Sequence, residues 1–198
     1  STYSGDAHPS KLFEGVKLRL AILIGSGGTG FSLFTSQYLK WFAQERSALF
    51  TWITFAPTPP HLWYLGLFPK LGRAIAGSVI EKMLRHSPIA KYRSLRGKTV
   101  FIHRVLTMFV KCFDFTPYFS SETAGMKRSD DYKPYQFLWE ADEDFALAIF
   151  NSSAFFNYFV ALGDCFHCGR EFVLGFPFDF GHSANEGDIQ FGPHGQRL

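Results

Sequence analysis

The chain has 198 residues, of which 46% are hydrophobic and 19% charged, so it is long enough to bury a core and too apolar to be a disordered chain. Lys and Arg number 20 against 17 Asp and Glu, and the resulting net charge of +3 does not by itself predict a polyanionic partner. The odd number of cysteines, three, argues against a secreted protein stapled by disulfides. The sequence also has no apolar run of membrane-spanning length and no signal-peptide pattern, so we expect a cytoplasmic protein.

The first third of the chain predicts two strands around a helix. Val16 to Gly25 (VKLRLAILIG) is a short apolar run closed by glycine, which is typical of a strand. The glycine-rich loop Gly25 to Gly30 follows it. Phe31 to Phe50 has helical spacing of its large side chains, and the β-branched and aromatic segment Thr51 to Phe55 predicts another short strand.

The next elements are a helix, a strand and a polar loop. Arg73 to Arg85 predicts a helix, and Lys98 to Val110 predicts a strand in which basic residues alternate with apolar ones. Cys112 to Phe119 is aromatic and contains a proline, as in an edge strand or a turn. The polar segment Ser120 to Pro134 predicts a loop.

The last third predicts one strand, one long helix and a tail. Tyr135 to Trp139 is a short strand by composition. Asp144 to Leu162 predicts a single buried helix with acidic residues at or before its start, where the helix dipole favours them. The segment from Gly181 to Leu198 is rich in glycine and polar residues and predicts a disordered tail.

The motif Gly25-x-Gly27-x-x-Gly30 lies between a predicted strand and a predicted helix, the context that dinucleotide binding requires. Such units usually carry an acidic residue at the end of the next strand to hold the ribose, and Thr51 to Ala56 has none. The loop is therefore either an ordinary surface loop, which we favour, or part of a nucleotide-binding α/β domain.

Cys165 and Cys168 form a C-x-x-C pair around His167. A structural zinc site needs four ligands, and Cys112 is the one remaining thiol. The surrounding sequence does not resemble a thioredoxin-like unit either. We therefore expect unpaired structural cysteines and no metal site.

A set of basic residues in the middle of the chain alternates with aromatic ones. This mixture suits a nucleic-acid surface, because cations pair with phosphates while rings stack on bases or sugars. A solvated sheet face would have the same composition. The set consists of Lys91, Arg93, Arg96, Lys98, Arg104, Lys111, Lys127 and Arg128, with Tyr92, Phe101, Phe109 and Tyr132 between them.

Three segments resemble blocks of the N6-adenine DNA methyltransferases, the group that includes type IIG restriction–modification enzymes. Ser1 to Gly25 resembles the family's S-x-x-x-x-R-P-S-x-L-F-x-G-V-x-x-R-L-x-I block, with His8 in place of the arginine. Phe34 to Phe50 resembles its T-x-x-Y-x-x-W-x-x-E-E-R-x-x-L-F stretch, with Gln44 in place of one glutamate. Leu147 to Pro177 resembles its C-terminal L-N-S-S-x-F block, which continues through D-C-x-H to F-P.

The resemblance implies an α/β fold made of family-like parts. Residues 1–60 would supply the last strands of a Rossmann-like methyltransferase domain, and residues 61–180 a mixed α+β target-recognition region, before the tail of residues 181–198. The methyl-transfer motif N/D-P-P-Y/F and the F-x-G-x-G cofactor loop are absent from the printed sequence. We therefore expect the C-terminal portion of such an enzyme, inactive alone, with no catalytic or S-adenosylmethionine-binding residue of its own.

The function implied is binding of double-stranded DNA and positioning of the target base, while S-adenosylmethionine and the catalytic motif belong to a missing N-terminal portion. A non-catalytic DNA-binding remnant remains an alternative, and the sequence does not decide whether an endonuclease is linked. The expected DNA contacts are Arg93, Arg96, Lys98, Arg104 and Lys111.

Phe13 is the expected stacking residue for the target base. Enzymes that modify a base extrude it from the duplex. In the family that the chain resembles, an aromatic residue just before the late strand packs on the flipped adenine, and Phe13 precedes Val16 to Gly25 in that way. A plain core phenylalanine is the alternative.

Overall fold

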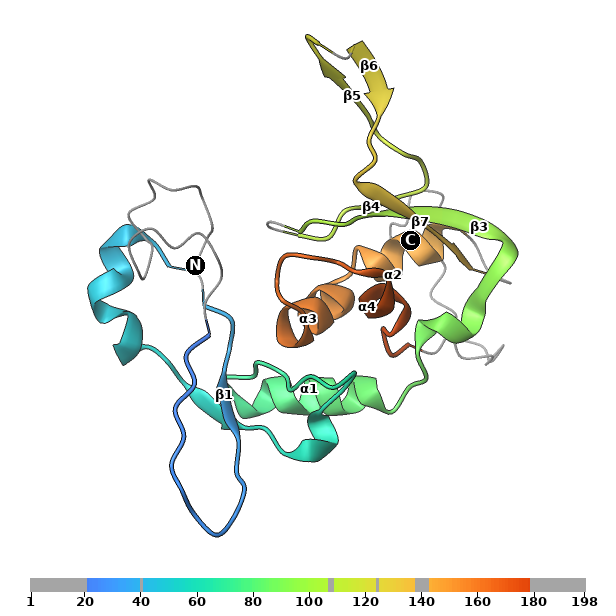
Figure 1. Cartoon of the computed structure of the whole chain (residues 1–198). Coiled ribbons are helices and arrows are strands. Elements are labelled where there is room, and N and C mark those ends of the chain that lie inside the picture. The colour runs from blue at the N-terminus through green and yellow to red at the C-terminus, as the bar shows by residue number, and fades with distance from the viewer. Residues whose placement is uncertain (1–20, 40, 107–108, 124, 138–142, 179–198) are drawn as a thin grey trace, which may run out of the picture. The chain divides into compact units, whose positions relative to one another are not determined.

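The computed structural model describes residues 21–39, 41–106, 109–123, 125–137 and 143–178. The chain divides into two compact units, Ser1–Glu81 and Lys82–Leu198. Both strands and helices are present (Figure 1), so the mixed α/β class expected from the sequence is confirmed. The division falls inside helix α1 (Ala74–Leu84), whereas the sequence places a boundary at residue 60.

The described part of the first unit contains a two-stranded antiparallel ribbon, formed by β1 (Phe34–Ser36) and β2 (Phe55–Pro57). The 3₁₀ helix η1 (Ala43–Thr51) connects the two strands, and the short 3₁₀ helix η2 (Pro60–Leu62) follows them. The helix predicted over Phe31–Phe50 is therefore wrong in its first half, which contains β1, whereas its residues 43–50 are helical and belong to η1. The predicted strand over Thr51–Phe55 coincides with β2 only at its last residue.

A buried threonine explains why this segment is extended. The Thr35 hydroxyl donates to the carbonyl of Pro69 at 2.7 Å, accepts from the amide of Leu71 at 3.1 Å and lies 2.8 Å from the Thr58 hydroxyl. Thr35 and Thr58 are both buried, so losing these partners would leave polar groups unsatisfied. These long-range bonds outweigh the helical spacing of the phenylalanines.

The glycine loop lacks the context of a nucleotide-binding turn. Residues 21–28 have no regular secondary structure, and Ile24 is 95% exposed. A Cβ atom added at Gly25, Gly27 or Gly30 would meet nothing within 4 Å. The strand predicted over Val16–Gly25 is thus wrong for its described residues, 21–25, and strand β1 follows the loop where the start of a helix was expected.

Helix α1 confirms the prediction for Arg73–Arg85 to within one residue at each end. Gly72, just before it, has φ +67°, and its Cα approaches Gln37 so closely that a Cβ would come within 2.7 Å of the Gln37 amide nitrogen. Only glycine suits this position.

The second unit is built on a three-stranded antiparallel sheet in the order β4-β3-β7. Its strands are β3 (Arg93–His103), β4 (Cys112–Phe113) and β7 (Tyr132–Phe137). The long central strand begins five residues before the predicted Lys98–Val110 and ends earlier. After His103 the chain leaves the sheet, because the amide of Leu106 donates to Phe166 and the carbonyl of Arg104 accepts from Cys168, both at 2.8 Å.

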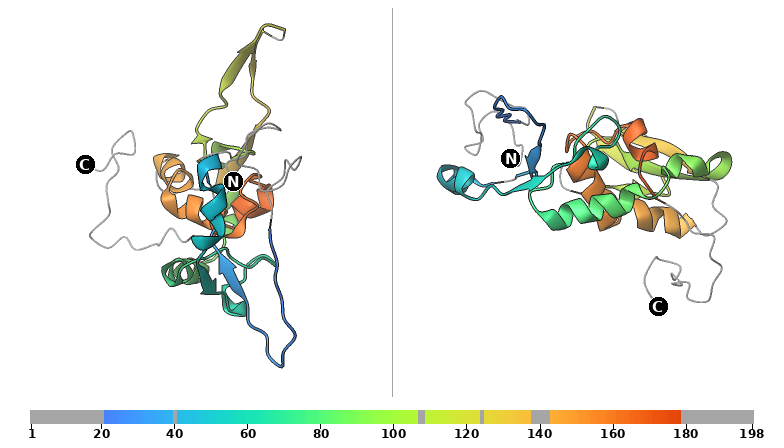
Figure 2. Two further views of the ribbon diagram at one scale, coloured as in Figure 1. Left: turned by 90° about the vertical axis from the view of Figure 1, so that its left-hand side faces the viewer. Right: turned by 90° about the horizontal axis from the view of Figure 1, so that it is seen from below.

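A second ribbon extends from this sheet. Strands β5 (Tyr118–Ser121) and β6 (Gly125–Arg128) form an antiparallel hairpin that projects beyond β4 and β7 (Figures 1 and 2). The predicted loop over Ser120–Pro134 is therefore wrong, because it contains β6 and the first residues of β7. Gly125, with φ +62°, opens β6 after the turn. The predicted strand over Tyr135–Trp139 is confirmed for residues 135–137.

Three helices cover one face of the sheet in the second unit (Figure 1): α2 (Glu143–Phe150), α3 (Ser153–Leu162) and α4 (Arg170–Leu174). The single helix predicted over Asp144–Leu162 is thus two. The chain breaks at Asn151 and Ser152, and the Ser152 hydroxyl caps α3 by accepting from the amide of Phe155 at 3.3 Å.

Aromatic side chains fill the space between the sheet and these helices. Phe150 contacts Phe137 from β7, with ring centroids 5.7 Å apart, and Phe155 of α3 at 5.1 Å. Phe155 also meets Phe176 edge-on at 5.1 Å. All four side chains are at most 1% exposed, so this cluster is the core of the unit.

Candidate nucleic-acid interface

The five basic residues expected to contact DNA lie in two groups along the second unit. Arg93 and Lys98 are exposed on β3, and Arg96, whose side chain is not described, lies between them in the chain. Arg104 and Lys111 are exposed near the other end of β3, before β4. At about 3.3 Å per strand residue, Lys98 and Arg104 are roughly 20 Å apart along the chain. The described side chains of Arg93 and Lys98 therefore lie apart from those of Arg104 and Lys111.

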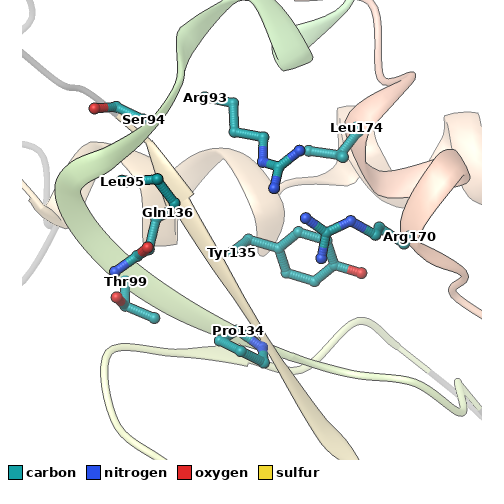
Figure 3. Close-up of a pocket in the computed structure, with 9 residues that line it drawn as sticks. All are labelled: Arg93, Ser94, Leu95, Thr99, Pro134, Tyr135, Gln136, Arg170 and Leu174. Carbon is teal, nitrogen blue, oxygen red and sulfur yellow. The ribbon is translucent and has the colours of Figure 1, made fainter.

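Arg93 of the first group lines a pocket at a bulge of the central strand. Arg93 and Lys98 are both opposite Phe137 of β7, so residues 94–97 loop out of the pairing. The resulting pocket has a volume of about 300 Å³ (Figure 3). Its walls include Arg93, Thr99, Tyr135, Gln136, Arg170 and Leu174.

Arg170 is the basic residue of the pocket that the sequence analysis did not single out. It begins α4, and its guanidinium carbon lies 6.0 Å from the centroid of the Tyr135 ring. The ring is buried, and burial is the main cause that raises the pKa of Tyr135 to about 12. Arg170 lies in the block that resembles the family's C-terminal motif, 77 residues from Arg93, so no spacing rule links the two.

In the second group, Arg104 is paired with an acidic residue. Its Nε donates to Oδ1 of Asp131 at 2.6 Å, and its amide donates to the carbonyl of Asp131 at 2.8 Å. The side-chain hydrogen bond from Arg104 is the largest of the causes that lower the pKa of Asp131. This double contact ties the chain between β6 and β7 to the end of β3, so the charge of Arg104 is already partly compensated.

The β5–β6 hairpin carries a further basic and aromatic surface. Tyr118 is directly opposite Arg128, and Phe119 is directly opposite Lys127. In each pair the cation lies over the ring, at 5.6 Å for Arg128 and 5.2 Å for Lys127 from the ring centroid. All four residues are exposed, and adjacent pairs point to opposite faces of the ribbon.

Lys127 and Arg128 belong to the basic set found in the sequence, but their rings were not recognised as partners. The signal was present in the chain: Tyr118 to Ser121 and Met126 to Arg128 flank a short polar turn that contains Gly125. A glycine within a turn of three to five residues between two short runs is typical of a hairpin.

The Cys165–Cys168 segment is a structural loop. One Asp164 oxygen accepts from the amides of Phe166 and His167 at 2.7 Å, and the other is 2.7 Å from Nδ1 of His167. Burial opposes ionisation of Asp164, but these hydrogen bonds prevail and lower its pKa.

The cysteines are free and buried, as expected. Burial is the largest cause that raises the pKa values of Cys112 and Cys168. Within the described residues, no three side chains of His, Cys, Asp or Glu come together as a metal-ligand group.

Phe13 lies outside the described residues, so its expected stacking role stays a prediction. No helix in the described ranges is both long and apolar enough to cross a membrane. No family model matches the chain, and no curated protein or solved structure is significantly similar to it.

Proposed function

We propose that this chain binds double-stranded DNA and positions the target base for S-adenosylmethionine-dependent N6 methylation of adenine. The observation that carries the DNA-binding part is the projecting β5–β6 hairpin with its cation-over-ring pairs. Methyl transfer is assigned to a catalytic portion that carries the N-P-P-Y motif and the cofactor loop. The family assignment rests on the three sequence blocks, and Phe13 keeps its proposed stacking role.

A two-stranded hairpin that carries exposed cations and rings supports this proposal. The major groove of B-form DNA is about 12 Å wide and admits a two-stranded β-ribbon. Lys127 and Arg128 would contact phosphates or base edges, while Tyr118 and Phe119 hold their charged groups in place and offer apolar surface to bases or sugars.

The proposed domain roles follow the family resemblance. The first unit would complete the Rossmann-like methyltransferase domain, and the second would be the target-recognition region. The block Leu147–Pro177 includes α3 and α4, which pack against the sheet that bears the hairpin. In this arrangement the family-like block is a scaffold and the hairpin is the reading element.

The test uses the full chain and mixed-sequence duplex DNA over a range of salt concentrations. The double variant Lys127→Gln/Arg128→Gln is compared with Arg73→Gln/Lys82→Gln, which removes the same charge from exposed positions at α1. Each lost phosphate contact should reduce the slope of log K against log salt by about one, so the hairpin variant should lose up to about two units. The control variant should lose much less.

Two results would contradict the proposal. If the wild-type chain does not bind duplex DNA, or if both double variants weaken binding equally, the hairpin is not a specific contact. A third result bears on the enzyme assignment: methyl transfer from labelled S-adenosylmethionine by the purified chain alone would show that catalysis does not need another portion.

A further inference from the structure

The pocket at the β3 bulge contains two like charges without a described counter-charge. Arg93 and Arg170 line the same pocket, and Figure 3 shows both guanidinium groups directed into it. Within the part of the chain that the structure describes, neither pairs with a carboxylate. Two cations in one pocket repel each other, and an anion bound between them would convert that repulsion into attraction.

We propose that this pocket binds a phosphate group between Arg93 and Arg170. Arginine presents a planar fork of N–H donors that matches the oxygens of a phosphate, and two such forks can hold one phosphate from two sides. The guanidinium of Arg170 is supported by the ring of Tyr135, which is 4% exposed and held by the core. The site is therefore partly organised before the ligand arrives.

The remaining polar wall residues belong to the other face of the sheet. Thr99 and Gln136 are directly opposite each other on β3 and β7, one position along from Tyr135, and their side chains lie across β7 from the two guanidinium groups (Figure 3), so Arg93 and Arg170 are the proposed phosphate ligands. Leu174 adds an apolar side for the group attached to the phosphate. A pocket of about 300 Å³ is at the small end for ligand sites, which favours one phosphate with its sugar over a dinucleotide.

The phosphate has two possible sources, a DNA backbone or a small molecule such as inorganic phosphate or a nucleotide. The DNA source rests on the proposed function, and the small-molecule source does not. The hairpin and the pocket use different residues, so each can be removed while the other is kept.

The experiment compares the pocket variant Arg93→Gln/Arg170→Gln with the control Arg73→Gln/Lys82→Gln in the full chain. One measurement is the shift in Tm caused by inorganic phosphate or pyrophosphate, against chloride at equal ionic strength. The other is the salt dependence of duplex binding. All four substituted residues are exposed, so the pocket variant and the control should both fold. Arg170→Lys serves as a second pocket variant, which keeps the positive charge but loses the planar fork of N–H donors.

A DNA source predicts that the pocket variant binds duplex about tenfold more weakly and loses about one unit of salt slope, with Arg170→Lys in between. A small-molecule source predicts that phosphate raises the Tm of the wild type and the control but not of the pocket variant, while DNA binding is unchanged. The proposal is overturned if the pocket variant behaves like the control in both measurements.

Failure of the pocket and failure of the proposed function are distinguishable. If the hairpin variant loses DNA affinity while the pocket variant matches the control throughout, DNA binding stands and the phosphate site falls. If the wild type does not bind duplex but phosphate stabilises it through Arg93 and Arg170, the phosphate site stands and the proposed DNA role falls.

Discussion

The core of the second unit and the β5–β6 hairpin contain the same aromatic residue types in two different environments. In the core, Phe155 is surrounded by rings: Phe150 and Phe176 each lie 5.1 Å from it, and none of the three is more than 1% exposed. On the hairpin, Phe119 is 41% exposed and its described partner is the ammonium group of Lys127. Aromatic content alone therefore does not separate packing from recognition.

The neighbours of each ring make the distinction. A ring among rings contributes to stability through buried apolar area and favourable edge-to-face geometry. A ring under an exposed cation contributes little to stability, about 0.5–1 kcal/mol, but orders a charged side chain that would otherwise move freely. The core rings should therefore affect folding, and the hairpin rings should affect binding.

Truncating one phenylalanine in each region gives the largest expected effect and tests the comparison directly. Phe155→Ala removes a fully buried ring and should lower the free energy of unfolding by about 3–5 kcal/mol. Phe119→Ala should lower it by less than about 1 kcal/mol while weakening duplex binding. Urea unfolding followed by circular dichroism and fluorescence anisotropy with labelled duplex measure the two quantities.

The comparison would break in two ways. A similar loss of stability in Phe155→Ala and Phe119→Ala would mean that the Phe119 ring contributes to folding as much as a core ring does, despite its exposure. Unchanged duplex binding in Phe119→Ala would mean that its ring has no part in recognition.

Elements that depend on local composition were predictable from the sequence. Helix α1 and the central strand β3 follow from residue patterns within a short window, and the mixed α/β class follows from their combination. Elements that depend on contacts with residues far away in the sequence were not predictable from it. Thr35 is extended because of Thr58, Pro69 and Leu71, a set of bonds that no window of 20 residues contains.

The candidate site likewise has features that the sequence predicted and features that it did not. The basic residues were visible as a set, but strand geometry separates Arg93 from Arg104, and Asp131 pairs with one and not the other. Arg170 enters the pocket only because α4 packs near the β3 bulge. Side-chain pairs across the hairpin depend on a turn that the polar composition of Ser120–Pro134 concealed.

Asn151 offers a sharper test, because it links the helical layer to the strand that leads into the hairpin. Its side chain accepts from the amide of Cys112 on β4 at 3.1 Å and donates to the carbonyls of Cys112 and Leu147, both at 2.9 Å. It thus satisfies both backbone groups of Cys112, as a neighbouring strand would.

Asn151→Ala should lower the free energy of unfolding by about 1–3 kcal/mol, because the backbone groups of a buried residue lose their partners. Asn157→Ala is the matched control, since Asn157 is exposed on α3 and should change stability by less than about 0.5 kcal/mol. Urea unfolding measures both, and hydrogen exchange of the Cys112 amide should be faster only in the Asn151 variant. Equal effects of the two substitutions would show that β4 is held by other contacts.

The smallest expected effect concerns the electrostatic tie at the base of the hairpin. The hydrogen bond from Arg104 is the largest cause that lowers the pKa of Asp131, and the charge of Lys133 is the last of the causes. Because the folded-state pKa is below the ordinary value for aspartate, this contact stabilises the fold above that ordinary value. The stabilisation is lost as the pH falls through the lowered pKa, when the carboxyl group takes up a proton.

Titration of the Asp131 carboxyl carbon by NMR follows this directly. The wild type should titrate below the ordinary aspartate value, and Arg104→Gln should return the pKa most of the way toward it. Lys133→Gln removes one positive charge from the same neighbourhood without removing the hydrogen bond, so it should move the pKa much less. If the two variants shift the pKa equally, general charge and not the Arg104 contact governs Asp131, and the guanidinium of Arg104 is as available to a phosphate as that of Arg93. If Arg104 dominates, Arg104→Gln should weaken duplex binding less than Arg93→Gln does, because its charge is already shared with Asp131.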